Sequence, residues 1–305
     1  MSIPGFATNR VAPSAGTRSL WRLAWRRFLT NRAAVAGALV FALLVLAAAC
    51  ANLIAPHDPV AQNIPKQFQE GFWKYGLSTS YLLGSDALGR DVLSRLLFGA
   101  RVTVLVASLA VLMALLAGIT TGLAAGFYGR MVDNILMRLM DVLLAFPTLI
   151  LAIAIIAILG PGISNAILAI GIVYTPAIAR VVRSSVLAVK EEDYVLAARA
   201  VGSRSLRIIL RHVLPNVIGP TAVYGTLGIA SAILDTSFLG FLGLGVQPPT
   251  AEWGTMLSDS RDYIALGYWW IAVFPGLIIS ITVLAVNLMG NGLRDAVDPR
   301  SGQRV

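Results

Sequence analysis

Long runs without a charged residue alternate with short polar segments along most of the chain. A helix needs about 20 mostly apolar residues to cross the ~30 Å hydrocarbon core of a membrane. Five charge-free runs exceed that length: residues 33–56, 102–129, 142–179, 213–234 and 263–293. The 142–179 run would form a helix of about 57 Å, too long for one crossing, and Gly160-Pro161-Gly162 interrupts it near the middle. The pattern therefore predicts an all-α fold with six transmembrane helices.

The composition excludes an ordinary soluble domain. Hydrophobic residues make up 57% of the 305 residues, charged residues make up 13%, and the mean hydropathy is +0.77. A soluble protein usually has about 25% charged residues, because much of its exterior must carry polar groups. The single cysteine also excludes a disulfide scaffold. We therefore expect a polytopic membrane protein.

The net charge of +9 fits the positive-inside rule better than a nucleic-acid-binding surface, and no nucleic-acid partner is expected. With a cytoplasmic N-terminus, 18 of the 24 Lys and Arg residues fall in inside segments and six in outside segments. The expected topology has a cytoplasmic basic arm at 1–32, a first helix at 33–56, an outside loop at 57–101, a five-helix core at 102–293 that includes a cytoplasmic loop at 180–215, and a cytoplasmic tail at 294–305.

A ladder of glycines marks the second predicted helix. Gly118, Gly122 and Gly126 repeat at intervals of four, so they lie along one helix face. Small residues at this spacing let another helix approach closely in lipid. The ladder predicts a helix-packing surface, and the spacing leaves open whether the neighbour is a second subunit or another helix of this chain.

Several charged residues lie in or beside the predicted helices. Asp235 falls well inside an apolar run, and an ionisable residue in a membrane is a functional candidate. Asp235 is therefore a candidate for the transport pathway, with a solvated or hydrogen-bonded helix end as the alternative. Arg138 and Asp141, three residues apart, are expected to form a local pair. Arg95 and Arg101 are expected to reach the lipid headgroups.

The sequence shows no catalytic or metal-binding constellation. His57 and His212 fall on opposite sides of the predicted membrane, so they cannot share a metal site or a catalytic triad. A GxxxxGK(S/T) loop is absent, and none of the three lysines follows a glycine, so no ATP site is expected. We expect neither enzyme activity nor a bound cofactor in this chain alone.

The most basic inside loop reads RVVRSSVLAVKEEDYVLAARAVGSRSLRIILRH over residues 180–212. Ala197 and Ala198 give a short helix a low profile, and Gly202 ends or bends it. Three arginines follow on one face of a second short helix. Small residues on such a helix suit close docking into a groove of another protein. A membrane-surface helix held by its arginines is the alternative.

This loop resembles the EAA loop, EAAxxxGx9IxLP, of binding-protein-dependent ABC importer permeases. Ala197-Ala198, Gly202 and Leu214-Pro215 match at the required distances, whereas Leu196 replaces the Glu and His212 replaces the Ile. Four longer strings resemble the dipeptide/oligopeptide branch, in its C-type permease subunit: YVLAARAVGSRSLRIILRHVLPN, LLGSDALGRDVLSRLLFGARV, SFLGFLGLGVQPPTAEWGTML and GNGLRDAVDPR.

The resemblance implies a type I ABC importer permease fold in the bacterial cytoplasmic (inner) membrane, and uptake of dipeptides or oligopeptides. It implies a second homologous permease subunit, two cytoplasmic ATPase subunits that bind the ATP, and an extracytoplasmic substrate-binding protein. By the same resemblance, the residues that couple this chain to an ATPase are Ala197, Ala198, Gly202, Leu214 and Pro215. The alternatives are a permease of this family for nickel or another small solute, and a stand-alone secondary transporter, which would favour internal inverted repeats.

Overall fold

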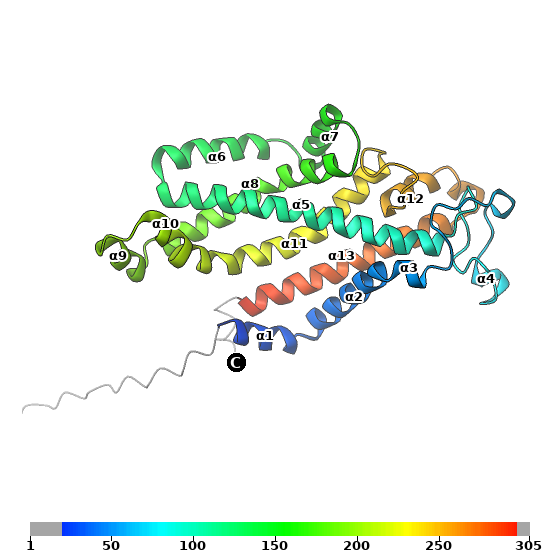
Figure 1. The fold of residues 1–305 in the computed structure, drawn as a ribbon, viewed down its shortest axis with the longest axis horizontal. Helices are drawn as coiled ribbons and strands as arrows, with labels where there is room; N and C mark the ends of the chain where they lie inside the picture. The colour runs from blue at the N-terminus through cyan, green and yellow to red at the C-terminus, as the bar shows by residue number, and fades with distance from the viewer. Residues whose placement is uncertain (1–19, 298–305) are drawn as a thin grey trace, which may run out of the picture.

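The computed structural model describes residues 20–297 and arranges them as an elongated bundle of helices (Figure 1). Most of the arm expected at 1–32 and the end of the tail expected at 294–305 lie outside the described residues. Between residues 20 and 297 the only β pairing is one bridge, between Ser85 and Asp91, so the fold is all-α. The long helices are α2 (Arg32–Ala49), α5 (Val92–Tyr128), α8 (Ile163–Val189), α11 (Leu214–Phe241) and α13 (Trp270–Val297). The shorter ones are α1 (Leu20–Thr30), α3 (Ala51–Ile54), α4 (Phe72–Tyr75), α6 (Arg130–Leu144), α7 (Thr148–Leu159), α9 (Asp193–Ala200), α10 (Ser205–Ile208) and α12 (Trp253–Ser260).

Five helical segments of the described chain are long and apolar enough to cross a membrane: α2, α5, α8, the continuous helix that runs from Ser205 through α11, and α13. The pair α6 and α7 passes the same test together, although the two helices are bent by 92° relative to each other. If this pair counts as one broken span, the described chain has six crossings in total. The charge-free run 142–179 predicted two helices with one break, at Gly160–Gly162, and this second bend was missed. Pro147 accounts for it, because proline disfavours helical geometry in the residue before it.

The helix α5 begins at Val92, ten residues before the run that predicted it. The Asp91 carboxylate accepts a hydrogen bond from the backbone N–H of Ser94 (2.9 Å), which is the geometry of a helix N-cap. A search for charge-free residues cannot find this start, because Arg95 and Arg101 lie in the first turns of the helix. The break between α7 and α8, in contrast, lies at Gly160–Gly162, where the sequence predicted it.

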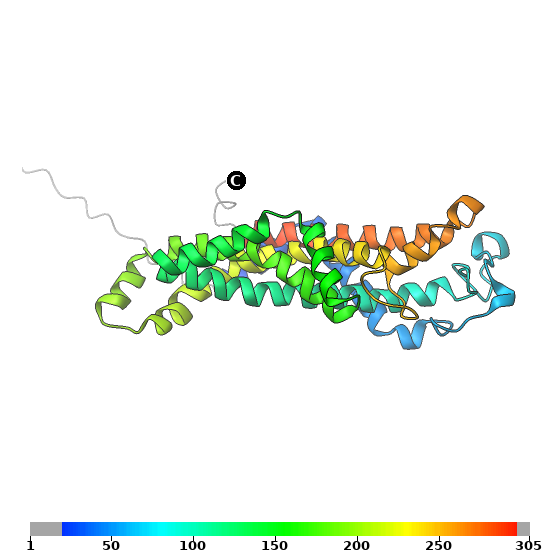
Figure 2. The same cartoon turned by 90° about the horizontal axis from the view of Figure 1, so that it is seen from above.

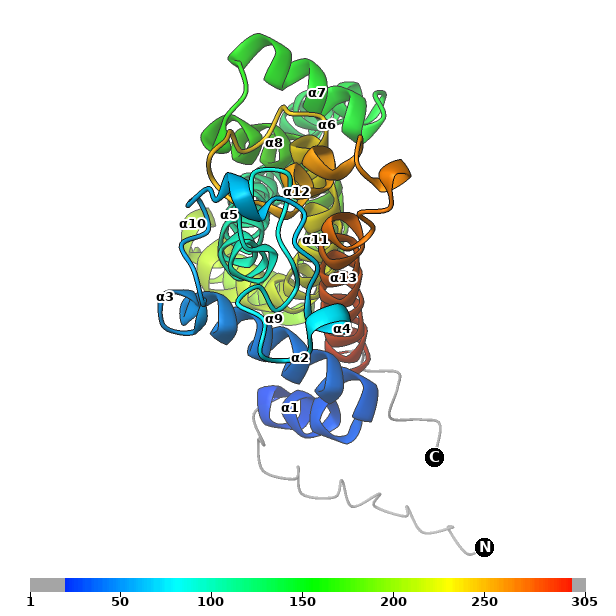
Figure 3. The same cartoon turned by 90° about the vertical axis from the view of Figure 1, so that its right-hand side faces the viewer.

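The bundle has two distinct ends. We call the end with α9 and α10 the α9 end, and the end with α4 and α12 the α12 end (Figure 1). Seen from above, the bundle is narrow and elongated, with these two ends at its opposite extremes (Figure 2). Viewed from the α12 end, α1 and α2 lie at one side and α6 and α7 at the opposite side, with α5, α8, α11 and α13 between them (Figure 3). Because α1 packs against α13, the two ends of the described chain lie together.

The glycine ladder of α5 lies against α8 of the same chain. A Cβ atom added to Gly118 would come within 2.6 Å of Ile178, one added to Gly122 within 2.6 Å of Val182, and one added to Gly126 within 2.8 Å of Val186. All three glycines are buried. Of the two neighbours that the sequence left open, these contacts favour a helix of this chain. Close approach lets α5 and α8 gain dispersion contacts, which hold helices together in lipid.

The segment between α3 and α5 packs onto the start of α13. The Phe68 ring stacks on Tyr268, with centroids 3.9 Å apart, and Trp73 contacts the rings of Trp269 and Trp270. The Trp270 indole N–H donates a hydrogen bond to the carbonyl oxygen of Ser85 (3.1 Å). The aromatic side chains therefore fix this polar segment against the α12 end of the bundle.

Candidate functional site

The basic loop at the α9 end contains a helix with a well-defined C-terminal cap. The backbone N–H of Ser203 donates to the carbonyl oxygen of Ala198 (3.1 Å), and the N–H of Gly202 donates to that of Arg199 (2.9 Å). This pair of hydrogen bonds is the Schellman motif, which needs a left-handed residue directly after the helix. Gly202 fills that position with a φ of +77°, and the space around its Cα is open. The glycine is therefore required by the backbone conformation and not by crowding.

One side of the loop is attached to the bundle. Val195 and Ala198 of α9 are buried in a cluster with Ile208, Ile209 and Val213, and this cluster continues onto buried residues of α5 and α8. The guanidinium of Arg199 lies over the Phe127 ring at the end of α5, 5.2 Å from its centroid. The loop is thus held in one position relative to the transmembrane helices.

The other side of the loop is exposed and apolar. Val201 is 81% exposed and Leu206 is 64% exposed, which is unusual for side chains of this type. The exposed large apolar side chains of the loop are Tyr194, Leu196, Val201, Leu206 and Leu210. The alanines and arginines of this loop can be found from the sequence, whereas its exposed apolar residues cannot, because their exposure depends on which face the fold buries.

The sequence-selected residues of the loop occupy different positions on it. Ala197 is exposed on α9, whereas Ala198 is buried beneath it. Leu196, which stands where the EAA pattern has its Glu, is exposed as well. Leu214 is half-buried and Pro215 is exposed in the first turn of α11, directly after the π-helical turn Ile209–Val213. The structure therefore brings Ala197, Leu196 and Gly202 to the surface of the loop.

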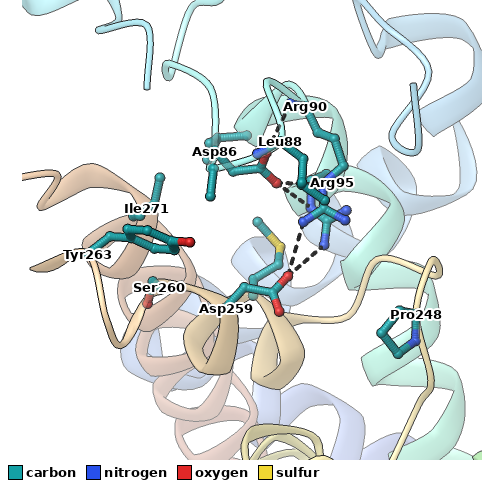
Figure 4. Close-up of a pocket in the computed structure, with 12 residues that line it drawn as sticks. Asp86, Leu88, Arg90, Arg95, Pro248, Asp259, Ser260, Tyr263 and Ile271 are labelled. Carbon is teal, nitrogen blue, oxygen red and sulfur yellow. Dashed lines mark hydrogen bonds and ion pairs between the residues drawn. The ribbon is translucent and has the colours of Figure 1, made fainter. Parts of the chain in front are cut away.

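A buried cluster of four charges lies at the α12 end (Figure 4). Arg90 donates to the carboxylate of Asp86 (2.6 Å) and to that of Asp259 on α12 (3.1 Å). Arg95 lies 3.6 Å from Asp86 and 3.7 Å from Asp259. Both arginines are buried, whereas the Asp259 side chain is 47% exposed at the edge of a cavity of about 290 Å³. The cluster joins the start of α5 to α12 and has no formal net charge.

This cluster corrects one expectation from the sequence. Arg95 does not reach toward lipid headgroups, because Asp86 and Asp259 hold its guanidinium inside the protein. Arg101 donates to the carbonyl oxygens of Ala48 and Ala49 (3.0 Å each) and so satisfies the end of α2. Asp86 and Arg90 lie in one turn, in which the Asp86 N–H donates to the carbonyl oxygen of Arg90 (3.0 Å), and no sequence signal indicates that Asp259 joins them.

Glu252, a second feature missed from the sequence, is completely buried just before α12. Its carboxylate accepts hydrogen bonds from the backbone N–H groups of Gly254 and Thr255 (2.9 Å each) and from the Thr103 hydroxyl (3.0 Å). A Cβ atom on Gly240 of α11 would collide with this carboxylate. Burial raises the pKa of Glu252 to about 7, and the accepted hydrogen bonds limit the rise. Glu252 therefore caps α12 and connects it to α5 and α11.

Asp235 lies on α11 and accepts a hydrogen bond from the Tyr174 hydroxyl of α8 (2.8 Å). The expected pair of Arg138 and Asp141 is wrong: Asp141 contacts Arg180 of α8 (2.5 Å). A separate pair joins Asp133 of α6 to Arg183 of α8 (2.5 Å). Within residues 20–297, no three His, Cys, Asp or Glu side chains come together as a group that could hold a metal ion.

Comparison with known proteins identifies the family of this chain. The family model described as "Binding-protein-dependent transport system inner membrane component" matches residues 118–303, which include α8 to α13 and the loop at the α9 end. The chain belongs to this family. A second model, the N-terminal transmembrane domain of oligopeptide transport permease C, matches residues 19–70. The protein is therefore a multi-pass membrane component, a permease subunit of an ABC importer, and it acts together with other transporter subunits.

Several relatives are similar over nearly the whole chain. The di/tripeptide transport system permease protein DppC of Pseudomonas aeruginosa is 49% identical over 90% of this chain and 91% of its own. The dipeptide permease DppC of Escherichia coli is 47% identical over 92% of this chain and 93% of its own. The glutathione transport system permease GsiD of Pectobacterium atrosepticum is 42% identical over 96% of both chains.

A solved structure shows the same fold. A chain of the MetNI methionine ABC transporter, in an inward-facing conformation, superposes with a TM-score of 0.53. The match covers 67% of this chain and 96% of that chain, with 19% sequence identity. At this identity the likeness concerns the fold, which is the ABC importer permease fold that the sequence predicted.

Proposed function

We propose that this chain is the permease subunit of an ATP-driven importer for dipeptides and oligopeptides. The support is the identity of 42–49% to permeases named for di/tripeptides, dipeptides and glutathione, which all carry peptide bonds. A second homologous permease would complete the translocation pathway. A substrate-binding protein would deliver the cargo at the α12 end, and ATP would be bound by two ATPase subunits at the α9 end.

The proposed orientation places the α9 end in the cytoplasm. Its support is the basic character of the exposed loop, which carries Arg199, Arg204, Arg207 and Arg211. Cytoplasmic segments of membrane proteins are enriched in Lys and Arg. Both ends of the described chain lie on the same side, which suits an even number of crossings.

The observation that carries the coupling role is the exposed apolar surface around Val201 and Leu206, held rigidly by the Schellman turn. Apolar side chains on a basic loop would be costly in water and suit the groove of a partner protein. We propose that this surface docks on an ATPase subunit, with Ala197 and Ala198 allowing close approach and Leu214 and Pro215 connecting the loop to α11.

Substitution of Gly202 tests this coupling role. Gly202→Val places a β-branched residue at φ +77°, a strained conformation that costs more than about 1–2 kcal/mol. We expect this variant to lose the ATPase subunits on purification while its amount in the membrane stays unchanged. Gly202→Asn is the matched control, because Asn adopts the left-handed conformation readily, and it should retain them. Normal recovery of the ATPases with the valine variant would reject the docking role.

The substrate class needs its own test, because permeases of this family for nickel or another small solute are the alternative. Calorimetric titration of the cognate binding protein with dipeptides, longer peptides, glutathione and Ni²⁺ would identify the cargo. We expect micromolar or tighter binding of peptides. Binding of Ni²⁺ alone would reject the peptide assignment and leave the permease architecture unaffected. A chain that transports by itself in liposomes would instead establish a secondary transporter.

A further inference from the structure

One face of α11 is not covered by any helix of the described chain. Tyr224, Ser231, Leu234 and Phe238 are exposed on it and recur at intervals of three, four and seven residues, so they lie along one face. The other faces of α11 pack against α5, α8 and α13. Asp235 is half-buried at the edge of the exposed face. Ionisable groups inside a membrane avoid lipid, so the part of this face beside Asp235 is expected to meet water or another protein.

Asp235 differs from Asp133 and Asp141 in that none of the ion pairs found in the described residues includes it. Asp133 and Asp141 each form an ion pair with an arginine of α8. Among the ion pairs found in residues 20–297, none includes Asp235, and its hydrogen-bond donor is the neutral phenol of Tyr174. The hydroxyl of Ser231 also lies beside this phenol. A carboxylate in such a place is stabilised when a positive charge comes to it from outside the chain.

Asp235 and Tyr174 lie at a depth that a peptide would pass during translocation. Asp235 lies six residues before the end of α11, or about 9 Å of helix, and Tyr174 lies eleven residues after the start of α8, or about 16 Å. Both therefore lie within the span, nearer to the α12 end. Tyr224 and Phe238 expose aromatic rings on the same face of α11, and such rings attract cations.

We propose that Asp235 and Tyr174 form a binding site for the ammonium group of a peptide in the translocation pathway. This inference rests on the proposed function, since it takes the cargo to be a peptide. Every free dipeptide or oligopeptide carries an N-terminal ammonium whatever its side chains are. A site for that group therefore suits a permease that accepts many sequences. The carboxylate supplies the charge, and the phenol oxygen supplies a second acceptor.

The charge of this site can be measured by thiol labelling at Ser231, one helical turn from Asp235. In a Cys50→Ala background, Ser231→Cys in the reconstituted complex is treated with a trimethylammonium and a sulfonate methanethiosulfonate reagent. We expect Asp235→Asn to lower the ratio of cationic to anionic labelling rates about tenfold. Ser164→Cys, near the start of α8 and about 15 Å of helix from Tyr174, is the matched control and should keep its ratio. An unchanged ratio at Ser231→Cys, or no reaction with either reagent, would overturn the proposal.

Transport by the same complex in liposomes gives an independent test. With a dipeptide-loaded binding protein and ATP, we expect uptake to fall about tenfold in Asp235→Asn, while Asp235→Glu retains most of it and stimulated ATP hydrolysis stays within about twofold. Asp262→Asn is the control, because Asp262 is an acid that is 79% exposed outside the spans. Normal uptake in Asp235→Asn would overturn the proposal.

Failure of the ammonium site and failure of the proposed peptide import give different experimental results. Loss of the second permease from purified Asp235→Asn would show that the carboxylate meets a basic residue at the subunit interface, and the ammonium site would then be wrong. Absence of peptide uptake in the wild-type complex would contradict the proposed function itself, and this inference would fall with it. An error in the inference alone leaves wild-type uptake intact.

Discussion

Gly122→Ala tests whether the glycine ladder holds α5 against α8. The new Cβ atom would lie 2.6 Å from the carbonyl oxygen of Ala179 and 2.6 Å from the Cβ of Val182. Ordinary contacts at such an atom begin at 3.4 Å, so 0.8 Å of separation is missing. Neither neighbouring atom is the flexible end of a side chain, so the two helices must move apart.

The energy follows from two opposing effects. Inserting a methyl group into a closely packed contact costs about 1–3 kcal/mol, and a gap of 0.5–1 Å forfeits a quarter to a half of each dispersion contact around it. Alanine gains about 1 kcal/mol over glycine in a helix interior. We therefore expect Gly122→Ala to lose up to about 2 kcal/mol. Gly276→Ala on α13 meets nothing within 4 Å, so it should be neutral or gain up to about 1 kcal/mol.

Thermal unfolding of the purified chain in detergent, followed by size-exclusion fluorescence, would measure this difference. We expect the Tm of Gly122→Ala to fall by several degrees relative to Gly276→Ala. Measurement with and without the second permease separates the two roles of the ladder. Equal Tm values for both variants would refute the packing argument, and a deficit that appears only in the assembled complex would identify the ladder as a subunit interface.

Two further predictions concern the α12 end. Because the pKa of Glu252 is raised to about 7 from 4.5, the folded state binds its proton more tightly, so the contribution of Glu252 to stability is greatest below pH 4.5 and falls by up to about 3 kcal/mol as pH rises to 7. The pH profile of the Tm of Glu252→Gln should lack this component, and parallel pH profiles for the two proteins would contradict it. Asp86→Ala should lower the free energy of unfolding by about 3–5 kcal/mol, because Arg90 and Arg95 stay buried without this carboxylate. Asp259→Ala, at the exposed edge of the cluster, should lower it by about 1 kcal/mol or less. Equal losses for the two variants in urea unfolding would show that burial does not decide the energy of the cluster.

The sequence predicted the fold class and the crossings well because both depend on long apolar runs, which lipid requires. It failed at α6 and α7 because a search for charge-free residues treats Pro147 like any apolar residue. It failed at the start of α5 for the opposite reason, because charged side chains such as Arg95 can be buried when another segment neutralises them. The partner Asp259 lies 164 residues away along the chain, and no local pattern specifies that contact.

The loop at the α9 end was predicted in part. The position of Gly202 was found from spacing, since a glycine at a helix end is a local signal with a local cause, the left-handed cap. The apolar surface around Val201 and Leu206 was not found, because burial of Val195 and Ala198 against α5 and α8 decides which face of the loop remains free. Features of a surface depend on tertiary packing even where the backbone is set locally.

A single helix connects the proposed docking loop with the proposed ammonium site. The segment Ser205–Phe241 is continuous, and it passes from the loop through a π-helical turn at Ile209–Val213 into α11. Asp235 lies on this helix, and beyond it Gly240 lies so close to Glu252 that a Cβ atom there would collide with the carboxylate. A displacement of the loop by an ATPase would act on the same helical segment that carries Asp235. If an ATPase docks on this loop as proposed, the backbone of α11 would connect its displacement to the ammonium site without a separate chain of side-chain contacts.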